Sequence, residues 1–261
     1  MENYFLSSLK PKCPFCGLSR KKFSRYGKLG CKYCLESFED IIQKFYEKLY
    51  FFPFQVGGAE KEELLPFYEN AEKKGLFAVI SELRQKGISI RLRIARNISN
   101  FPYPIHRSVS KLRIISFLKE KKITQSLPEE YSLYYLDEDH VRLSTMIGSE
   151  KDLQNWEINT SALNHPELFE FSSFGGYINS CPSNCGKGTK ISVRLKLPAL
   201  IQRPLLFKKL VPLSHTLLAE GEVIMDRNSV LTLYYKNPSN AEIRQFLFYA
   251  YALREFNESL E

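Results

Sequence analysis

The sequence predicts an α+β protein in which helices flank an antiparallel β-sheet, with a small zinc ribbon at the N-terminus. Three short segments alternate apolar and polar residues, a pattern typical of strands with one buried and one wet face. Helical spacing of apolar residues follows the N-terminal cysteines, and a helix-start signal precedes the last apolar segment. Two Cys-x-x-Cys pairs near the N-terminus predict the ribbon.

The composition is that of an ordinary globular protein, with 44% hydrophobic and 25% charged residues in 261. No run approaches the roughly 18 apolar residues of a membrane span, and the start MENYFLSSLKPKC lacks the features of a signal peptide. We therefore expect a cytoplasmic protein without membrane contact. The net charge of +8 fits a phosphate-bearing partner, but a lysine-rich solvated surface explains it equally well.

The four N-terminal cysteines have the spacing of a structural zinc site. Cys13 and Cys16 form one pair, Cys31 and Cys34 form the second, and residues 17–30 separate them. Two such turns present four thiolates to one tetrahedral ion, whereas disulfides are rare in a reducing compartment. Four reduced cysteines without metal are the alternative.

An amphipathic helix is predicted after the second pair. Ser37 begins a capping-box-like Ser-x-x-Asp, and apolar residues recur at helical spacing as far as Pro53, namely Phe38, Ile41, Ile42, Phe45 and Leu49. Residues 54–61, FQVGGAEK, contain Gly-Gly and no periodicity. The expected organisation is a ribbon with its helix over 1–53, a linker over 54–61 and one larger domain over 62–261.

Three predicted strands, over residues 89–95, 138–144 and 190–197, place basic side chains on one face. The polar faces carry, in that order, Arg91 and Arg93; Glu138, His140 and Arg142; and Lys190, Ser192, Arg194 and Lys196. Planar guanidinium groups on neighbouring strands could grip a triphosphate bidentately. The alternative is that each strand belongs to any antiparallel sheet with one solvated face.

The same segments resemble known sequences. SIRLRIARN resembles the SSRIRLARN segment of protein-arginine kinases, DEDHVRL resembles their NEEDHLRI, and FGGYINSCPSNCGKGTKISVRLKLPAL resembles their FGYLTSCPTNxGTGxRASVxLxLPAL. The blocks follow the family's order, and the C-terminal LTLYYKNPSNAEIRQFLFYAYALREF is similar to its last strand and helix. The chain thus resembles a shortened catalytic domain of the ATP:guanido phosphotransferase (phosphagen kinase) family. CPFCGLSRKKFSRYGKLGCKYCLESFED resembles the zinc module of the bacterial protein-arginine kinase activator.

The resemblance implies roles for individual residues. The nucleotide phosphates would be bound by basic residues of the strands, namely Arg91, Arg93, Arg142, Lys190 and Arg194. Glu138 would orient the attacking guanidinium and help to deprotonate it, with Mg²⁺ bridging the phosphates of ATP. Cys181 corresponds to the family's active-site cysteine, although a buried structural cysteine is the alternative. The expected cofactors are structural zinc and ATP with Mg²⁺.

The chain departs from the family pattern in three places. Lys190 replaces the arginine that begins the family's ASV strand, which keeps the charge but loses the fork. The stretch between Arg93 and Glu138 is shorter than in the family. The RGxxGE loop has no clear copy, and its nearest candidate puts His215 at the arginine position and Glu220 at the acid.

Two functions follow from this pattern. The first is an ATP-dependent phosphotransferase that is expected to act on arginine guanidinium groups in proteins, with a fused activator-like zinc module. The second is a catalytically impaired pseudokinase that serves as a nucleotide-binding regulator or adaptor. The expected partners are protein substrates, or a partner kinase and protease complex, together with nucleotide. A nucleic-acid-binding ribbon is disfavoured because the basic strands lack interleaved aromatic residues.

Overall fold

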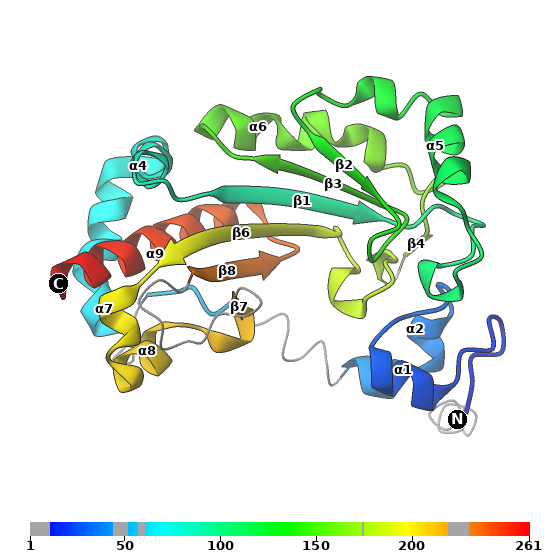
Figure 1. Cartoon of the computed structure of the whole chain (residues 1–261), viewed down its shortest axis with the longest axis horizontal. Helices are drawn as coiled ribbons and strands as arrows, with labels where there is room; N and C mark the ends of the chain where they lie inside the picture. Colours follow the sequence, from blue (N-terminus) through cyan, green and yellow to red (C-terminus); the bar gives the residue numbers. More distant parts are fainter. Residues whose placement is uncertain (1–10, 44–51, 57–60, 174, 219–229) are drawn as a thin grey trace. The chain divides into compact units, whose positions relative to one another are not determined.

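A computed structural model describes residues 11–43, 52–56, 61–173, 175–218 and 230–261 (Figure 1). The α-helices of these residues are α1 (Arg20–Tyr26), α2 (Cys34–Ser37), α4 (Leu65–Gln85), α5 (Lys111–Glu120), α6 (Glu150–Asn159), α7 (Pro198–Ile201), α8 (Pro204–Leu210) and α9 (Asn240–Ser259). The strands are β1 (Ile90–Arg96), β2 (Ser132–Tyr135), β3 (Val141–Met146), β4 (Phe171–Ser172), β5 (Gly176–Tyr177), β6 (Thr189–Lys196), β7 (Thr216–Leu218) and β8 (Val230–Lys236).

Six strands form the main sheet in the order β2-β3-β1-β6-β8-β7, while β4 and β5 form a small ribbon. The pairs β2–β3, β6–β8 and β7–β8 are antiparallel, which confirms the predicted α+β class with an antiparallel sheet. Two predicted strands appear almost unchanged as β1 and β6. The third begins late, because Glu138 lies in a bend before β3 and not on its polar face.

The chain divides into two compact units, each described separately below. The first comprises residues 1–51, 93–145 and 156–189, and the second comprises residues 52–92, 146–155 and 190–261. The boundary passes through β1 and β6. The predicted division at residues 54–61 stays a prediction, since residues 57–60 lie outside the described part of the chain.

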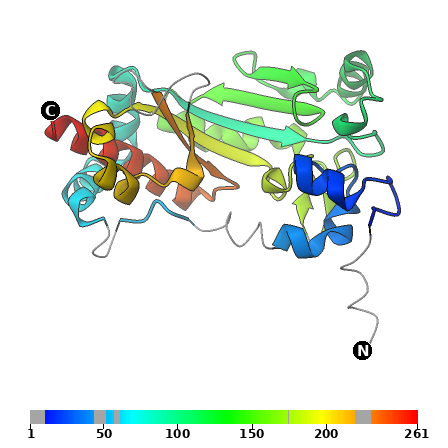
Figure 2. The ribbon, with the colours of Figure 1, turned by 60° about the horizontal axis from the view of Figure 1, so that its bottom comes forward.

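The second unit is built around α9, which is buried over most of its length and packs along α4 (Figure 2). A helix that is apolar on every side belongs in a core. Ser239 starts α9 with a complete capping box to Glu242, as the sequence predicts. Phe54, within the predicted linker, is fully buried and makes edge contacts with the rings of Phe246 and Tyr249. This aromatic cluster fixes residue 54 in the core of the unit.

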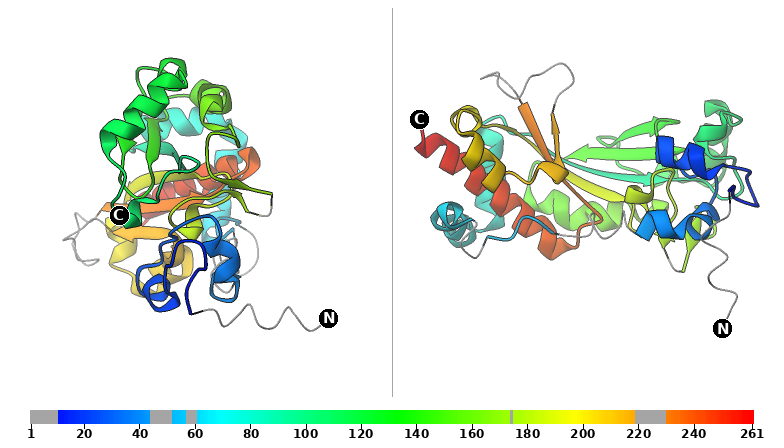
Figure 3. Two further views of the ribbon diagram at one scale, coloured as in Figure 1. Left: turned by 90° about the vertical axis from the view of Figure 1, so that its right-hand side faces the viewer. Right: turned by 90° about the horizontal axis from the view of Figure 1, so that it is seen from below.

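The zinc module, drawn in blue in Figure 3, belongs to the first unit. It shares the hydrophobic core of that unit. One hydrophobic cluster contains residues of the zinc module and residues from later segments of the chain. The module contributes Leu18, Phe23, Leu29, Leu35, Phe38 and Ile42, and the later segments contribute Tyr103, Ile178 and Cys185. The module is therefore packed as part of the unit and is not a separate domain.

The helix predicted from Ser37 differs in its start. Ser37 is the last residue of α2, and its hydroxyl donates to the carbonyl of Tyr33 at 2.8 Å, so it does not cap the next helix. Residues 39–43 are helical, and the remainder of the predicted helix lies outside the described residues. None of the described helices is long and apolar enough to cross a membrane.

Candidate acceptor site and zinc centre

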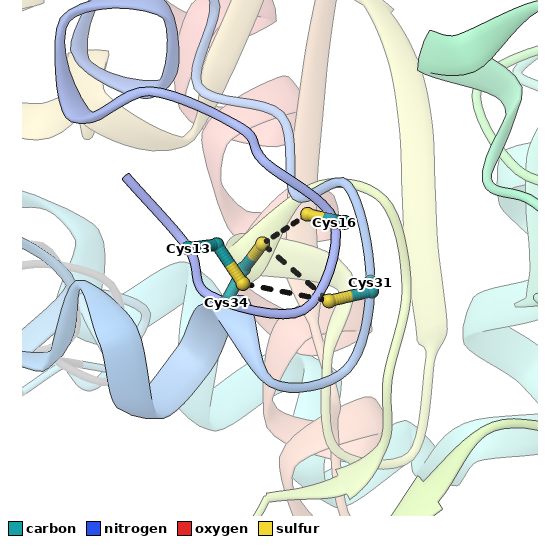
Figure 4. A group of neighbouring side chains, drawn as sticks. All are labelled: Cys13, Cys16, Cys31 and Cys34. Carbon is teal, nitrogen blue, oxygen red and sulfur yellow. Dashed lines mark hydrogen bonds between the residues drawn. The ribbon is translucent and has the colours of Figure 1, made fainter. Parts of the chain in front are cut away.

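The four predicted metal ligands lie together (Figure 4). All four sulfur atoms are within 4.8 Å of one another. The Sγ–Sγ distances are 3.7 Å for Cys13–Cys31, 3.5 Å for Cys16–Cys34 and 3.9 Å for Cys31–Cys34. Tetrahedral zinc with bonds of about 2.3 Å requires sulfurs about 3.8 Å apart. The cluster therefore fits a structural zinc ion held by four thiolates.

Gly30 is the residue that lets the second cysteine pair approach the first. Its amide donates to Cys34 Sγ at 3.4 Å, the kind of contact that stabilises a ligating thiolate. A Cβ at this position would lie 2.9 Å from Cys16 Sγ and 3.0 Å from His106 Nε2. Any larger residue would thus push apart both the cysteine cluster and the segment packed on it.

The loop between the cysteine pairs is bound to two later segments of the first unit. The amide of Leu29 donates to the carbonyl of Ser180 at 2.7 Å. His106 Nε2 lies 2.9 Å from the carbonyl of Gly30. These two bonds place the loop beside Cys181 and beside the bend that carries Glu138.

Glu138 lines a cleft of about 720 Å³ in the first unit. Its Oε1 accepts from the ammonium group of Lys28, and its Oε2 accepts from Asn184 Nδ2 at 2.8 Å. The Glu138 side chain is 32% exposed, so solvent and ligands can reach it. The carboxylate that the sequence predicts to hold the acceptor guanidinium is therefore oriented by Asn184 and already pairs with a cation.

A buried polar network fixes the bend behind Glu138. Asp139 is fully buried and accepts from the amide of Ser180 at 2.6 Å and from Asn97 Nδ2 at 3.2 Å. Asn97 Oδ1 in turn accepts from the amide of His140 at 3.0 Å. Burial raises the pKa of Asp139, while the bonds from Ser180 act in the opposite direction. The network ties the end of β1, the bend and the Cys181 loop together.

His140 is part of this network as a neutral ring and is not on a wet strand face, where the sequence pattern had placed it. The amide of Ile98 donates to its Nδ1 at 2.9 Å, so Nε2 carries the proton and donates to the Pro102 carbonyl at 2.8 Å. Burial lowers the pKa of His140 from 6.5 to about 4. Its role is therefore structural.

This lowered pKa predicts a loss of stability in acid. Between pH 6.5 and pH 4, His140 is protonated in the unfolded chain but not in the folded chain. The free energy of unfolding therefore falls as pH falls. The slope from this group reaches at most about 1.4 kcal/mol per pH unit. We expect His140→Gln, which keeps a donor and an acceptor, to lose less stability than wild type between pH 7 and pH 5 in urea unfolding. Equal losses would contradict this prediction. The contribution of Asp139 is common to both proteins.

Cys181 and Arg142 are also in the first unit. Cys181 Sγ lies 3.0 Å from Ser183 Oγ, and the residue is half-buried in the loop that follows Ser180. Arg142 forms an ion pair with Asp137, and its guanidinium lies 4.6 Å from the ring centroid of Tyr134. Both roles assigned by resemblance stay predictions.

The remaining predicted residues lie on the strands that cross the unit boundary or outside the described residues. Arg91 and Arg93 are two residues apart on β1 and so share a face. Lys190 and Arg194 share a face of β6, but Lys190 is buried with its Nζ 3.8 Å from the ring centroid of Tyr234. Arg194 lines a second cleft of about 620 Å³ in the second unit. Glu220 lies outside the described residues, and nucleotide binding by these arginines stays a prediction.

His215, which the nearest candidate for the RGxxGE loop puts at the family's arginine position, is buried in the second unit. Its Nδ1 lies 2.9 Å from Ser214 Oγ, and its ring contacts the rings of Phe54 and Tyr235.

Several residues of the site were missed although they stand inside motifs that the sequence displays. Asn97 ends SIRLRIARN, Asp139 stands in DEDH, and Asn184 stands in CPSN. Lys28 lies in the GKLGCKYC segment of the zinc module. Because Asn97, Asp139 and Asn184 lie inside these motifs, the sequence could have indicated them as site residues. No local pattern indicates that Lys28 reaches Glu138.

Two family models match separate parts of the chain. Residues 107–216 match the ATP:guanido phosphotransferase C-terminal catalytic domain, and residues 10–50 match the McsA central zinc-finger domain. Both resemblances are thereby confirmed.

Known proteins agree with these matches. The chain is 29% identical over 166 residues to the protein-arginine kinase of Brevibacillus brevis, covering 44% of this chain and 46% of that protein. It is 27% identical over 158 residues to the protein-arginine kinase of Symbiobacterium thermophilum, covering 58% of this chain and 42% of that protein. The chain spans less than half the length of these two curated relatives.

Solved structures share the fold. A duplicated taurocyamine kinase from Schistosoma mansoni superposes with a TM-score of 0.57 at 17% identity, covering 88% of this chain and 41% of that one. A lombricine kinase gives a TM-score of 0.51 at 14% identity, covering 89% of this chain and 80% of that one.

Proposed function

We propose that the chain is an ATP-dependent phosphotransferase that acts on arginine guanidinium groups of proteins. The zinc module forms part of the same enzyme. The observation that carries this proposal is Glu138. Its carboxylate stands in an open cleft, is oriented by Asn184 and pairs with a cation. A carboxylate in this state is suited to bind a guanidinium bidentately.

The reaction needs few chemical groups from the protein. A guanidinium nitrogen attacks the γ-phosphorus, the bond to the bridging oxygen of ADP breaks, and the guanidinium loses one proton. Glu138 would align the attacking nitrogen and accept the proton that the guanidinium loses, and Cys181 would lie beside the acceptor. Arg91, Arg93 and Arg142 would neutralise the phosphates, and Mg²⁺ bound with the nucleotide would supply further positive charge. A kinase of this kind uses cytoplasmic ATP, which agrees with the expected location.

The direct test is incubation of the 261-residue chain with Mg-ATP and an arginine-rich protein, followed by mass spectrometry for acid-labile phosphoarginine. Phosphoarginine that depends on the chain and on ATP would support the proposal. ATP binding without any phosphoarginine would overturn it in favour of the pseudokinase alternative.

The nucleotide part of the proposal makes a separate prediction. We expect Arg93→Ala to weaken ATP binding by about 1.5–3 kcal/mol, the usual contribution of a charged hydrogen bond. Isothermal titration calorimetry measures this change, and Arg25→Ala, on the surface of the zinc module, serves as the control. Equal ATP affinity in the two variants would remove Arg93 from the nucleotide site.

A further inference from the structure

Lys28 of the zinc module binds the Glu138 carboxylate, which is the group that an acceptor arginine would bind. Its ammonium group pairs with Glu138, which is 110 residues away in the sequence. The two residues that follow Lys28 are anchored by the bonds of Leu29 to Ser180 and of Gly30 to His106. Lys28 is thus held at Glu138 by the backbone of its own loop and not only by its flexible side chain.

A guanidinium competes with Lys28 for Glu138. One carboxylate oxygen accepts from Lys28 and the other accepts from Asn184. A guanidinium that binds both oxygens would place a second positive charge beside the ammonium group, and because like charges at that distance repel, it displaces Lys28. The pair is weak enough for this exchange, because the two side chains are 35% and 32% exposed.

The walls of the cleft indicate which arginines fit. Lys22, Lys28 and Arg107 line it together with the two acidic residues Asp137 and Glu138. Asp137 is already neutralised by its ion pair with Arg142. Once a guanidinium occupies Glu138, three cations remain on the walls of the cleft, and they attract negative charge beside the bound arginine.

We propose that this cleft is the acceptor site and that Lys28 binds Glu138 in place of the substrate guanidinium until substrate arrives. The preferred substrate is an arginine flanked by acidic residues. The inference rests on the proposed function, since that function assigns Glu138 to the acceptor. The zinc module then forms one wall of the substrate site and regulates access to it.

The occupancy of Glu138 by Lys28 can be measured without ATP. The full chain with zinc is treated with sulfosuccinimidyl acetate, and the acetylation rates of Lys28 and Lys21 are compared by mass spectrometry. Lys21 is an exposed lysine of the same module outside the cleft. We expect Glu138→Gln to raise the rate at Lys28 and to leave the rate at Lys21 unchanged. An unchanged rate at Lys28 would overturn the inference.

Displacement by substrate is tested with three short peptides. The first, acetyl-Asp-Arg-Asp-amide, should raise the acetylation rate of Lys28 in the wild-type chain. The second has citrulline at the central position, and the third has glycines beside the arginine. We expect no effect from the citrulline peptide and a smaller effect from the glycine peptide. A response to citrulline, or none to the arginine peptides, would contradict displacement, and equal responses to both arginine peptides would contradict the acidic preference.

Binding of the glycine peptide, measured by calorimetry, gives a second readout. We expect Lys28→Met to tighten its Kd about two- to fivefold, the range for removing a competitor held by a partly exposed ion pair. Lys21→Met is the matched control and should leave Kd unchanged. A weaker or equal Kd in Lys28→Met would overturn the role of Lys28.

These measurements separate the inference from the proposed function. Neither labelling nor peptide binding requires phosphoryl transfer, so both give the same result in a chain that forms no phosphoarginine. If phosphoarginine forms while Lys28 labelling is unaffected by Glu138→Gln, the inference is wrong and the proposed function stands.

Discussion

Glu138→Gln is expected to reduce phosphoarginine formation by about 10²–10⁴-fold, the usual contribution of a positioned acid or base. The amide keeps the shape of the side chain and can still accept from Asn184, but it loses the charge that binds a guanidinium. ATP binding should change little, because removing a negative charge near phosphates does not weaken their approach. Phosphoarginine mass spectrometry and nucleotide calorimetry measure the two effects.

The matched control is Glu167→Gln, an exposed glutamate of the same unit whose carboxylate lies beside His165. Full turnover in Glu138→Gln would mean that another acid handles the acceptor. Loss of ATP binding would mean that Glu138 organises the basic residues and does not contact the acceptor.

Local signals predicted the parts of the fold that depend on local chemistry. Alternation at residues 89–95 and 190–197 gave β1 and β6, since a strand with a buried face must repeat every second residue. Ser239 and Glu242 predicted the start of α9 because both capping partners are close in sequence. The cysteine spacing predicted the cluster for the same reason.

The rest depends on contacts between distant segments. The pattern placed Glu138 and His140 on a strand face, but Asp139 between them is held by Ser180 and Asn97, which bends the chain there. Lys190 keeps its strand position and is buried against Tyr234, an environment that alternation alone cannot indicate. Lys28 reaches Glu138 only because the zinc loop docks on Ser180 and His106.

The predicted zinc site and the proposed acceptor site are connected through one short stretch of chain. Lys28 contacts Glu138, Gly30 approaches Cys16 and His106, and Cys31 belongs to the cysteine cluster. The conformation of residues 28–31 thus depends on the cysteine cluster at one end and positions the ammonium group of Lys28 at the other. Loss of the metal should therefore affect both sites.

We predict one zinc ion per chain in the wild-type protein, and Cys31→Ser is expected to abolish its binding. A hydroxyl does not replace a thiolate as a zinc ligand. Mutating a group that only hydrogen-bonds to a ligand lowers metal affinity by about 10–100-fold, and the loss of affinity in Cys31→Ser should be larger. Because zinc binding stabilises such modules by about 10–16 kcal/mol, the core around Phe23, Leu29 and Phe38 should loosen, and thermal unfolding should begin earlier.

Elemental analysis and differential scanning calorimetry measure these two changes, with Cys181→Ser as the control. Cys181 lies outside the cluster, so this variant should keep its zinc. Acetylation of Lys28 should also rise in Cys31→Ser, because the loop that presents Lys28 to Glu138 starts at the metal. A wild-type chain without zinc, or full zinc content in Cys31→Ser, would show that the four sulfurs do not form the metal site. Loss of zinc with unchanged Lys28 reactivity would instead show that Ser180 and His106 alone hold the loop in place.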